Sequence, residues 1–382
     1  MISNSAVELF QQRETPFYHY DLTLLKGTID SVKSLAKQFD FDIHYAVKAN
    51  SNERILQELR DAGFGADCVS GNEVKLAAEM GFPVDSILFA GVGKTDKEIN
   101  LALELNIKAF NCESIQEVEV LNQLALAQDK VAEIALRINP NVDAKTHKYI
   151  TTGLDENKFG INQIDLPEFI LRLPEFSNVK LTGLHFHIGS QITDMKVFKG
   201  LCLRVNEIQN WFADNGVQIE HLNLGGGLGI DYNSPDKNSI PDFKTYFTIF
   251  SEFLERKANQ KVHFELGRSI VGQCGSLISR VVFIKKGLNT SFAIVDAGMT
   301  ELMRPALYQS YHQIDNLTSS GEEAVYDVVG PICESTDCFG KAVKLPETKR
   351  GDLIALRSAG AYGEVMTSRY NLRDQNEPLY TN

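Results

Sequence analysis

The sequence lacks a hydrophobic run of the ~18 residues that a membrane-spanning helix needs. Its first residues also lack the basic region and apolar segment of a secretory signal. The formal net charge is −12 over 382 residues, which argues against nucleic-acid binding through phosphates. We therefore expect a cytoplasmic protein with a small-molecule substrate and no membrane or nucleic-acid partner.

Cysteine is scarce, and its spacing is not that of a zinc site. The six cysteines are Cys68, Cys112, Cys202, Cys274, Cys333 and Cys338. A chain of this length does not need disulfide bonds to fold. We interpret the cysteines as reduced thiols that mostly fill the core, and we predict no metal site.

Short apolar runs alternate regularly with helical patterns through the first two thirds of the chain. The runs cover residues 42–48, 64–68, 86–90, 107–110, 133–138, 180–187, 219–224 and 261–265. Such alternation predicts parallel strands joined by right-handed crossovers. Eight units over about 240 residues favour a (β/α)8 TIM barrel, with an open doubly wound sheet as the alternative.

The pattern changes after Arg268, where strand-like runs are separated by Gly, Pro and polar turns. These runs cover residues 276–284, 291–296, 324–329, 352–357 and 361–366. The sequence therefore predicts an α/β barrel over residues 25–267. It also predicts a β-rich, sandwich-like or barrel-like domain formed by residues 1–24 and 268–382, with a short strand near Tyr18.

Residues at the carboxyl ends of barrel strands are the candidates for a catalytic site, because these ends meet on one face. They are Lys48, Asp67, Arg137, His185, His187, Ser190, the glycine run 225–229, Glu265, Gly267 and Arg268. A lysine at the end of a buried strand is costly unless its charge is paired, lost or used. Its desolvated amine suits Schiff-base chemistry, although such a lysine can also extend into solvent.

The run Gly225, Gly226, Gly227 would let backbone amides approach a phosphate, with Ser190 as a further donor. A tight barrel turn is the alternative, and a dinucleotide-binding loop fits poorly because no acidic partner follows at the right distance. His187 could stack on a flat ring or have a purely structural role. We interpret His185, which we expect to point the other way, as structural.

Glu265 is the acid among the candidates. A carboxylate beside a pyridine nitrogen keeps that nitrogen protonated and makes the ring an electron sink. A lysine, a phosphate cradle and such an acid together describe a site for pyridoxal 5'-phosphate. The alternative is that Glu265 pairs with a basic residue inside the barrel.

Six motifs together resemble the fold-type III pyridoxal-phosphate decarboxylases, from about residue 15 to about residue 373. They are YAVKAN at 45–50, HFHIGSQ at 185–191, GGGLG at 225–229, MRPALY at 303–308, CESTD at 333–337 and GAYG at 360–363. One departure is Leu266, where the family usually has proline in a Glu-Pro-Gly-Arg motif. The acid and the arginine of that motif are kept.

The resemblance implies a homodimer with shared active sites and pyridoxal 5'-phosphate as the cofactor. It implies that Lys48 carries the cofactor as a Schiff base and that His187 stacks on its ring. The other implied cofactor-binding residues are Asp67, Arg137, Ser190, Gly225, Gly226, Gly227, Glu265, Gly267, Arg268 and Tyr362.

The resemblance also implies how the substrate is bound. Its carboxylate would contact Arg268, Arg304 and Tyr308, and its distal amine would contact Glu334. Tyr362 is a further implied substrate-binding residue. Cys333 would be the proton donor, and Cys333 and Glu334 would reach across the dimer interface.

These residues imply decarboxylation of an amino acid with charged groups at both ends, such as meso-2,6-diaminopimelate. An arginine can bind the second carboxylate through two hydrogen bonds. Two alternatives stay open. One is a decarboxylase of ornithine, arginine or carboxynorspermidine, and the other is a non-catalytic protein that binds pyridoxal phosphate.

Overall fold

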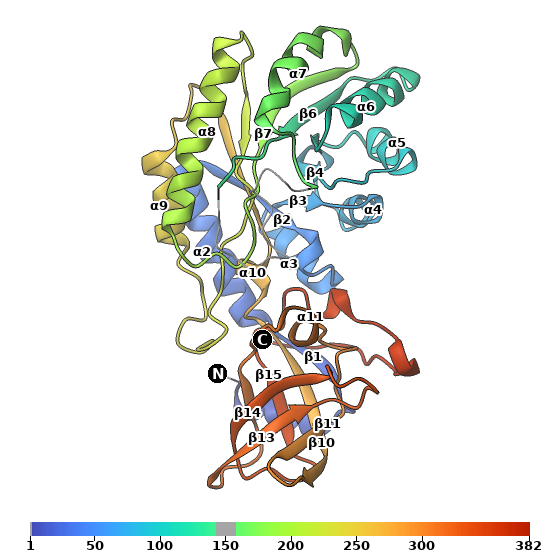
Figure 1. Cartoon of the computed structure of the whole chain (residues 1–382), viewed down its shortest axis with the longest axis vertical. Coiled ribbons are helices and arrows are strands. Elements are labelled where there is room, and N and C mark those ends of the chain that lie inside the picture. The colour runs from blue at the N-terminus through green and yellow to red at the C-terminus, as the bar shows by residue number, and fades with distance from the viewer. Residues whose placement is uncertain (1, 143–157) are drawn as a thin grey trace. The chain divides into compact units, whose positions relative to one another are not determined.

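The computed structural model describes residues 2–142 and 158–382 and divides into two compact units (Figure 1). The barrel unit comprises Ile29–Gly229 and Asp242–Gly267. The β-rich unit comprises Met1–Thr28, Ile230–Pro241 and Arg268–Asn382. Residues 25–28 and 230–241 fall within the predicted barrel, whereas their contacts lie with the β-rich unit. We propose the boundaries of the compact units instead.

Eight parallel strands close into a barrel in chain order, with the last strand paired to the first. They are β2 (Phe41–Ala46), β3 (Gly65–Cys68), β4 (Ile87–Phe89), β5 (Ala109–Cys112), β6 (Ala132–Arg137), β7 (Val179–His185), β8 (His221–Asn223) and β9 (Lys261–Leu266). All eight predicted strands are confirmed, and the doubly wound alternative is wrong. The first ends earlier than predicted, because residues Val47–Ala49 form the 3-10 helix η1.

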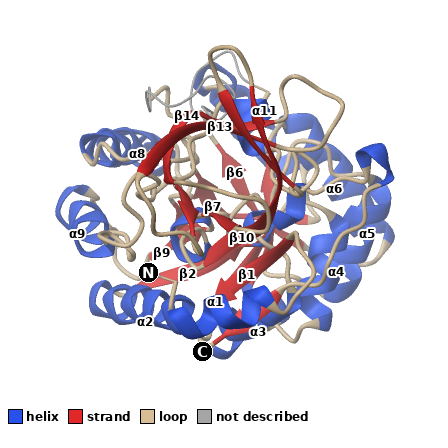
Figure 2. Cartoon of the chain, turned by 90° about the horizontal axis from the view of Figure 1, so that it is seen from below, coloured by secondary structure: helices blue, strands red, loops and turns tan. Residues whose placement is uncertain are grey.

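Helices surround the barrel strands, and Figure 2 shows them as an outer ring. They are α2 (Leu22–Phe39), α3 (Glu53–Asp61), α4 (Gly71–Glu79), α5 (Asp96–Leu105), α6 (Ile115–Ala127), α7 (Leu166–Arg172), α8 (Lys196–Asp214) and α9 (Phe243–Phe253). Side-chain caps begin several of them, including a complete capping box between Thr95 and Glu98 at α5. Helix α2 was not predicted, although Asp21 accepts a hydrogen bond from the amide of Leu24 at its start.

Phe264 anchors the packing of α9 against the barrel wall. Its side chain is fully buried, and its ring centroid lies 4.8 Å from that of Phe250 and 5.2 Å from that of Phe247. Neighbouring residues of a strand point to opposite faces, so Glu265 points into the barrel when Phe264 points outward. This apolar contact therefore also sets the direction of the acid.

The β-rich unit contains a mixed sheet in the order β12-β15-β10-β11-β13-β14, with β1 paired to β10 and β16. Its strands are β1 (Phe17–Asp21), β10 (Gly275–Lys286), β11 (Ser291–Val295), β12 (Ile314–Asn316), β13 (Glu323–Val329), β14 (Cys338–Pro346), β15 (Leu353–Leu356) and β16 (Leu379–Thr381). Its short helices include α1 (Asn4–Gln11), α10 (Arg268–Val271) and α11 (Arg304–Tyr308). The predicted β-rich character is confirmed, but α1, β12, β14 and β16 were missed.

The strand predicted over residues 361–366 is wrong. These residues form a turn that leads into the 3-10 helix η5 (Glu364–Met366). Tyr362 has a φ of 55°, and a Cβ atom on Gly360 would lie 1.9 Å from the carbonyl oxygen of Val271. The close approach requires glycine at position 360, and the left-handed conformation of Tyr362 interrupts any extended strand.

Among the described residues, the structure contains no helix that is both long enough and apolar enough to cross a membrane.

Replacing Phe264 with Ala should lower the free energy of unfolding by about 3–5 kcal/mol, because it leaves a cavity among aromatic rings. Denaturant titration followed by circular dichroism measures this change. Leu126→Ala, at a helix position whose side chain is 61% exposed, is the matched control and should cost far less. Equal losses in the two variants would contradict the assigned core.

Candidate active site

Lys48 lies in η1, immediately after β2, and its Nζ is 3.1 Å from Oδ2 of Asp67 at the end of β3. The buried hydroxyl of Tyr45 donates to the carbonyl of Asn50 and holds this turn closed. Burial and the nearby charge of Glu265 raise the pKa of Asp67, against the opposing effect of Lys48. The structure therefore brings the predicted lysine and a buried acid into contact.

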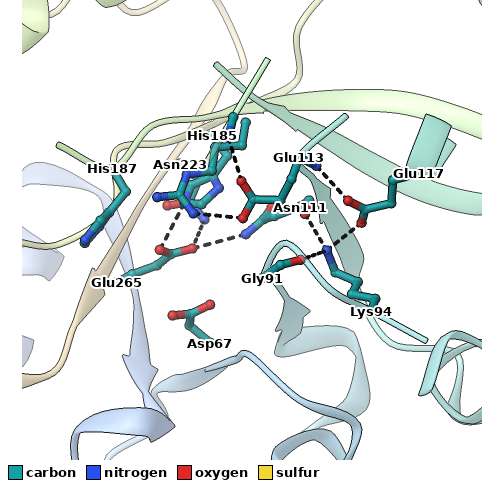
Figure 3. A network of polar contacts seen from close by, with 12 residues as sticks. Asp67, Gly91, Lys94, Asn111, Glu113, Glu117, His185, His187, Asn223 and Glu265 are labelled. Atoms are coloured by element: carbon teal, nitrogen blue, oxygen red, sulfur yellow. Dashed lines mark hydrogen bonds and ion pairs between the residues drawn. The ribbon is translucent and has the colours of Figure 1, made fainter. Parts of the chain in front are cut away.

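Glu265 is at the centre of a buried network inside the barrel (Figure 3). Asn111 and Asn223 donate side-chain amides to its Oε1 at 3.2 and 2.6 Å, and Nε2 of His185 lies 3.0 Å from its Oε2. Burial by itself would raise the pKa of Glu265, but His185 and Lys48 outweigh it and hold the pKa below its ordinary range. The carboxylate is therefore ionised at neutral pH.

The direction expected for His185 relied on alternation along a strand, but β7 ends at His185 and His187 lies beyond it. His185 is buried in the barrel and contacts Glu265 directly. Asn111 and Asn223 were missed altogether, although a polar residue inside a short, fully buried run such as Ala109–Cys112 is a usable signal.

The glycine run is required by close approaches of the backbone. A Cβ atom would lie 2.3 Å from the carbonyl oxygen of Phe186 if placed on Gly225, and 2.1 Å from that of Glu265 if placed on Gly226. Gly227 has a φ of 102°. The turn is thus tight, and the amide of Gly225 donates to the side chain of Asn223 at 3.0 Å.

The half-buried His187 lies beside this glycine turn, and the amide of Gly226 donates to its Nδ1 at 3.4 Å. Enclosure by protein atoms, together with the charges of Arg137 and Lys48, lowers the pKa of His187 well below its usual value. The imidazole is therefore neutral. Ser190 is half-buried on the following segment, which bonds to the turn through the amide of Ile192 and the carbonyl of Gly227.

Arg137, at the end of β6, is paired with Glu113 at 2.8 Å, and both side chains are buried. The second oxygen of Glu113 accepts a hydrogen bond from the amide of Gly160. Next to this pair, the buried amine of Lys94 donates to Glu117 at 2.5 Å and to the carbonyl of Asn111 at 2.8 Å (Figure 3). The sequence analysis predicted Arg137 but missed the partners that neutralise its charge.

Gly267 packs against the turn that carries Lys48. A Cβ atom at this position would lie 2.8 Å from the Cβ of Ala49. The position after Glu265 in the chain is the buried Leu266. Replacement of the family proline by leucine therefore leaves the acid inside the barrel and the glycine at its close contact.

Within the β-rich unit, Arg268 and Arg304 are buried beside aromatic rings. Arg268 donates to the hydroxyl of Tyr232 at 2.6 Å, and its guanidinium lies 4.7 Å from the ring centroid of Tyr362. The guanidinium of Arg304 lies 5.8 Å from the ring centroid of Tyr308. The structure thus groups four of the predicted substrate-binding residues.

Arg304 has an unusual environment for a buried cation. It donates to Ser310 at 3.2 Å, but its buried Nε has no hydrogen-bond partner among the described residues. Burial and the charge of Arg268 lower its pKa. A buried guanidinium with an unused donor fits a carboxylate ligand.

Cys333 and Glu334 lie on an exposed turn between β13 and β14. Both belong to the β-rich unit. In the parts of the chain that the structure describes, no group of His, Cys, Asp or Glu side chains is arranged to hold a metal ion.

Three histidines share the barrel interior with Glu265. His263 precedes Glu265 by two residues on β9, its Nε2 lies 3.0 Å from Nδ1 of His221, and its ring centroid lies 5.0 Å from that of His44. Burial lowers the pKa of His44 to about 4 and that of His263 well below its usual value. These rings are neutral at pH 7.

Residues 26–272 match the family described as "Pyridoxal-dependent decarboxylase, pyridoxal binding domain". The diaminopimelate decarboxylase of Bacteroides thetaiotaomicron is 56% identical over 369 residues, 96% of each chain. That of Aquifex aeolicus is 41% identical over 97% of this chain and 87% of its own. The structure of the Helicobacter pylori diaminopimelate decarboxylase with L-lysine is similar, with a TM-score of 0.93 and 40% identity over 98% of this chain and 94% of that one.

The buried histidines predict how stability depends on pH. Folding lowers the pKa of His44 from 6.5 to about 4. The resulting contribution of His44 to the free energy of unfolding is therefore fully present above pH 6.5, and it is lost as the pH falls from about 6.5 to about 4. The loss should amount to about 3 kcal/mol. His44→Gln should flatten this part of the curve of unfolding free energy against pH, and an unchanged slope would contradict the assignment.

Proposed function

This chain belongs to the pyridoxal-dependent decarboxylases, and on that premise we propose that it decarboxylates meso-2,6-diaminopimelate to L-lysine. This reaction is the last step of lysine biosynthesis, and its cofactor is pyridoxal 5'-phosphate. Relatives that match almost the whole chain carry the corresponding name. The similar structure that contains L-lysine holds the product of this reaction.

The residues of the barrel fit the cofactor. The glycine turn has no side chains of its own, so its backbone can lie close to a phosphate, and Ser190 lies on the neighbouring segment. Lys48 would hold the cofactor covalently, and the neutral ring of His187 would stack on it. Gly267, Arg268, Tyr362, Asp67 and Arg137 are the other residues that we propose for this site.

The ionised Glu265 is the observation that carries the proposal. Bound pyridoxal phosphate supplies a ring that accepts the electron pair left behind by carbon dioxide. Glu265 would keep the nitrogen of that ring protonated, because Asn111, Asn223 and His185 hold its carboxylate oriented and charged. These three are therefore positioning residues for the acid.

The β-rich unit supplies groups for the two ends of the substrate. Arg304, with Arg268, Tyr308 and Tyr362, binds a carboxylate, which is the group that the unused donor of Arg304 requires. Glu334 accepts from the distal amine. Ornithine has no carboxylate at its far end, so it would leave Arg304 unpaired.

Cys333 delivers the proton that replaces carbon dioxide on the same carbon, and it acts with Glu334 from the partner subunit of a homodimer. Both residues are exposed on the single chain, and a loop that enters the active site of a partner subunit has to be exposed in this way. The same unit exposes large apolar side chains that an interface would cover, including Leu307, Tyr311 and Leu372. All six cysteines are free thiols, which supports a reducing, cytoplasmic location.

Purified protein incubated with pyridoxal phosphate and meso-2,6-diaminopimelate should release L-lysine and carbon dioxide in equal amounts. Lys48→Ala should abolish release, because the covalent attachment of the cofactor is lost. It should also remove the long-wavelength absorbance of the lysine-linked cofactor. Absence of lysine from the wild-type reaction at saturating cofactor would refute the function, and an unchanged absorbance band in the variant would refute the role of Lys48.

Arg304→Met should lower kcat/KM for meso-2,6-diaminopimelate roughly 10- to 100-fold, because one charge-assisted contact is worth about 1.5–3 kcal/mol. Most of the change should be in KM. Arg304→Lys keeps the charge but not the paired donors, so it should recover part of the lost kcat/KM. Steady-state kinetics with lysine detection measures the effect, and equal values for Met and wild type would show that the carboxylate binds elsewhere.

A further inference from the structure

The turn that carries Cys333 and Glu334 is fixed at its base by the buried Asp337. Oδ1 of Asp337 accepts from the amide of Met299 at 2.6 Å, and Oδ2 accepts from the amide of Ile332 at 2.7 Å. Its carbonyl accepts from the amide of Gly330 at 3.1 Å. These bonds close the loop but do not reach the side chains at its tip.

The tip is held by a different element, the 3-10 helix η6 (Tyr370–Leu372). Oδ1 of Asn371 accepts from the amide of Cys333 at 3.2 Å, and the hydroxyl of Tyr370 donates to Oε1 of Glu334 at 2.9 Å. Asn371 has a φ of 57°, a left-handed conformation that asparagine tolerates better than most residues. Two adjacent residues thus hold the two adjacent residues of the tip.

These bonds matter because the tip is exposed. Packing cannot restrict the rotamers of an exposed carboxylate, so its direction depends on hydrogen bonds. The phenol of Tyr370 is protonated at neutral pH, as a tyrosine ordinarily is, and the contact with Glu334 raises its pKa further. With Oε1 held by Tyr370, Oε2 is left to accept from an ammonium group.

We propose that Tyr370 and Asn371 are positioning residues that aim Glu334, and through it set the selectivity for a substrate with an amine beside its distal carboxylate. This inference rests on the proposed function, because it takes the distal amine as the ligand of Glu334. It assigns a substrate-selecting role to a helix outside the motif that contains Cys333 and Glu334.

The test compares two competitive inhibitors of the holoenzyme. L-Lysine retains the amine and carboxylate of the unreacted end of the substrate, whereas 6-aminohexanoate has the same carboxylate without that amine. Tyr370→Phe should raise the inhibition constant of L-lysine roughly five- to tenfold, the loss of about one hydrogen bond. The constant for 6-aminohexanoate and the absorbance of the bound cofactor should stay as in wild type.

Asn371 allows a matched pair of variants. Asn371→Gly keeps the left-handed backbone and removes the side-chain acceptor. It should therefore raise the inhibition constant of L-lysine as Tyr370→Phe does. Asn371→Asp keeps an acceptor oxygen and should restore most of the affinity for L-lysine. If Gly and Asp bind L-lysine equally, the hydrogen bond to Cys333 has no positioning role.

A double-mutant cycle separates aiming from general support. Tyr370→Phe should have no further effect on L-lysine binding when Glu334 is already Ala. Equal weakening of both inhibitors, or loss of the wild-type oligomer in sedimentation, would show that the helix only supports the fold and would overturn the inference. Failure of the wild-type protein to release lysine would instead refute the proposed function.

Discussion

A carboxylate kept ionised inside the barrel is the constraint on which the site depends. An isolated buried charge is strongly disfavoured, and Glu265 is retained because two amides and an imidazole surround it. Those donors come from three other strands of the closed barrel. Phe264 and Glu265 are neighbours on β9, so their side chains point to opposite faces of the strand. The packing of Phe264 outside the barrel therefore also places the charge of Glu265 inside it.

The same balance of burial and charge distinguishes the two arginines with assigned roles. Arg137 is buried with Glu113, so its charge is already neutralised within the chain. Arg304 is buried beside Tyr308 and has an unused donor. The first arrangement stabilises a wall of the site, and the second is complete only when an anion binds.

Much of the fold could be predicted from the sequence because its signals are local. Alternation of apolar runs and helix caps such as Thr95 with Glu98 depends on neighbours only a few residues apart. The short strands of the β-rich unit have weaker signals. The predicted strand near Tyr362 failed because Tyr362 has a left-handed conformation, which no local apolar pattern indicates. The direction expected for His185 had no basis in strand alternation, because β7 ends at His185 and His187 lies beyond it.

The sequence by itself determined the eight strand units, the lysine and acid at their ends, and the resemblance to a decarboxylase family. Only the tertiary structure decided which groups surround them. Asn111 and Glu265 are 154 residues apart, and Tyr370 and Glu334 are 36 apart. No periodicity reports such contacts, because they exist only once the barrel has closed and the turn after β13 has met η6.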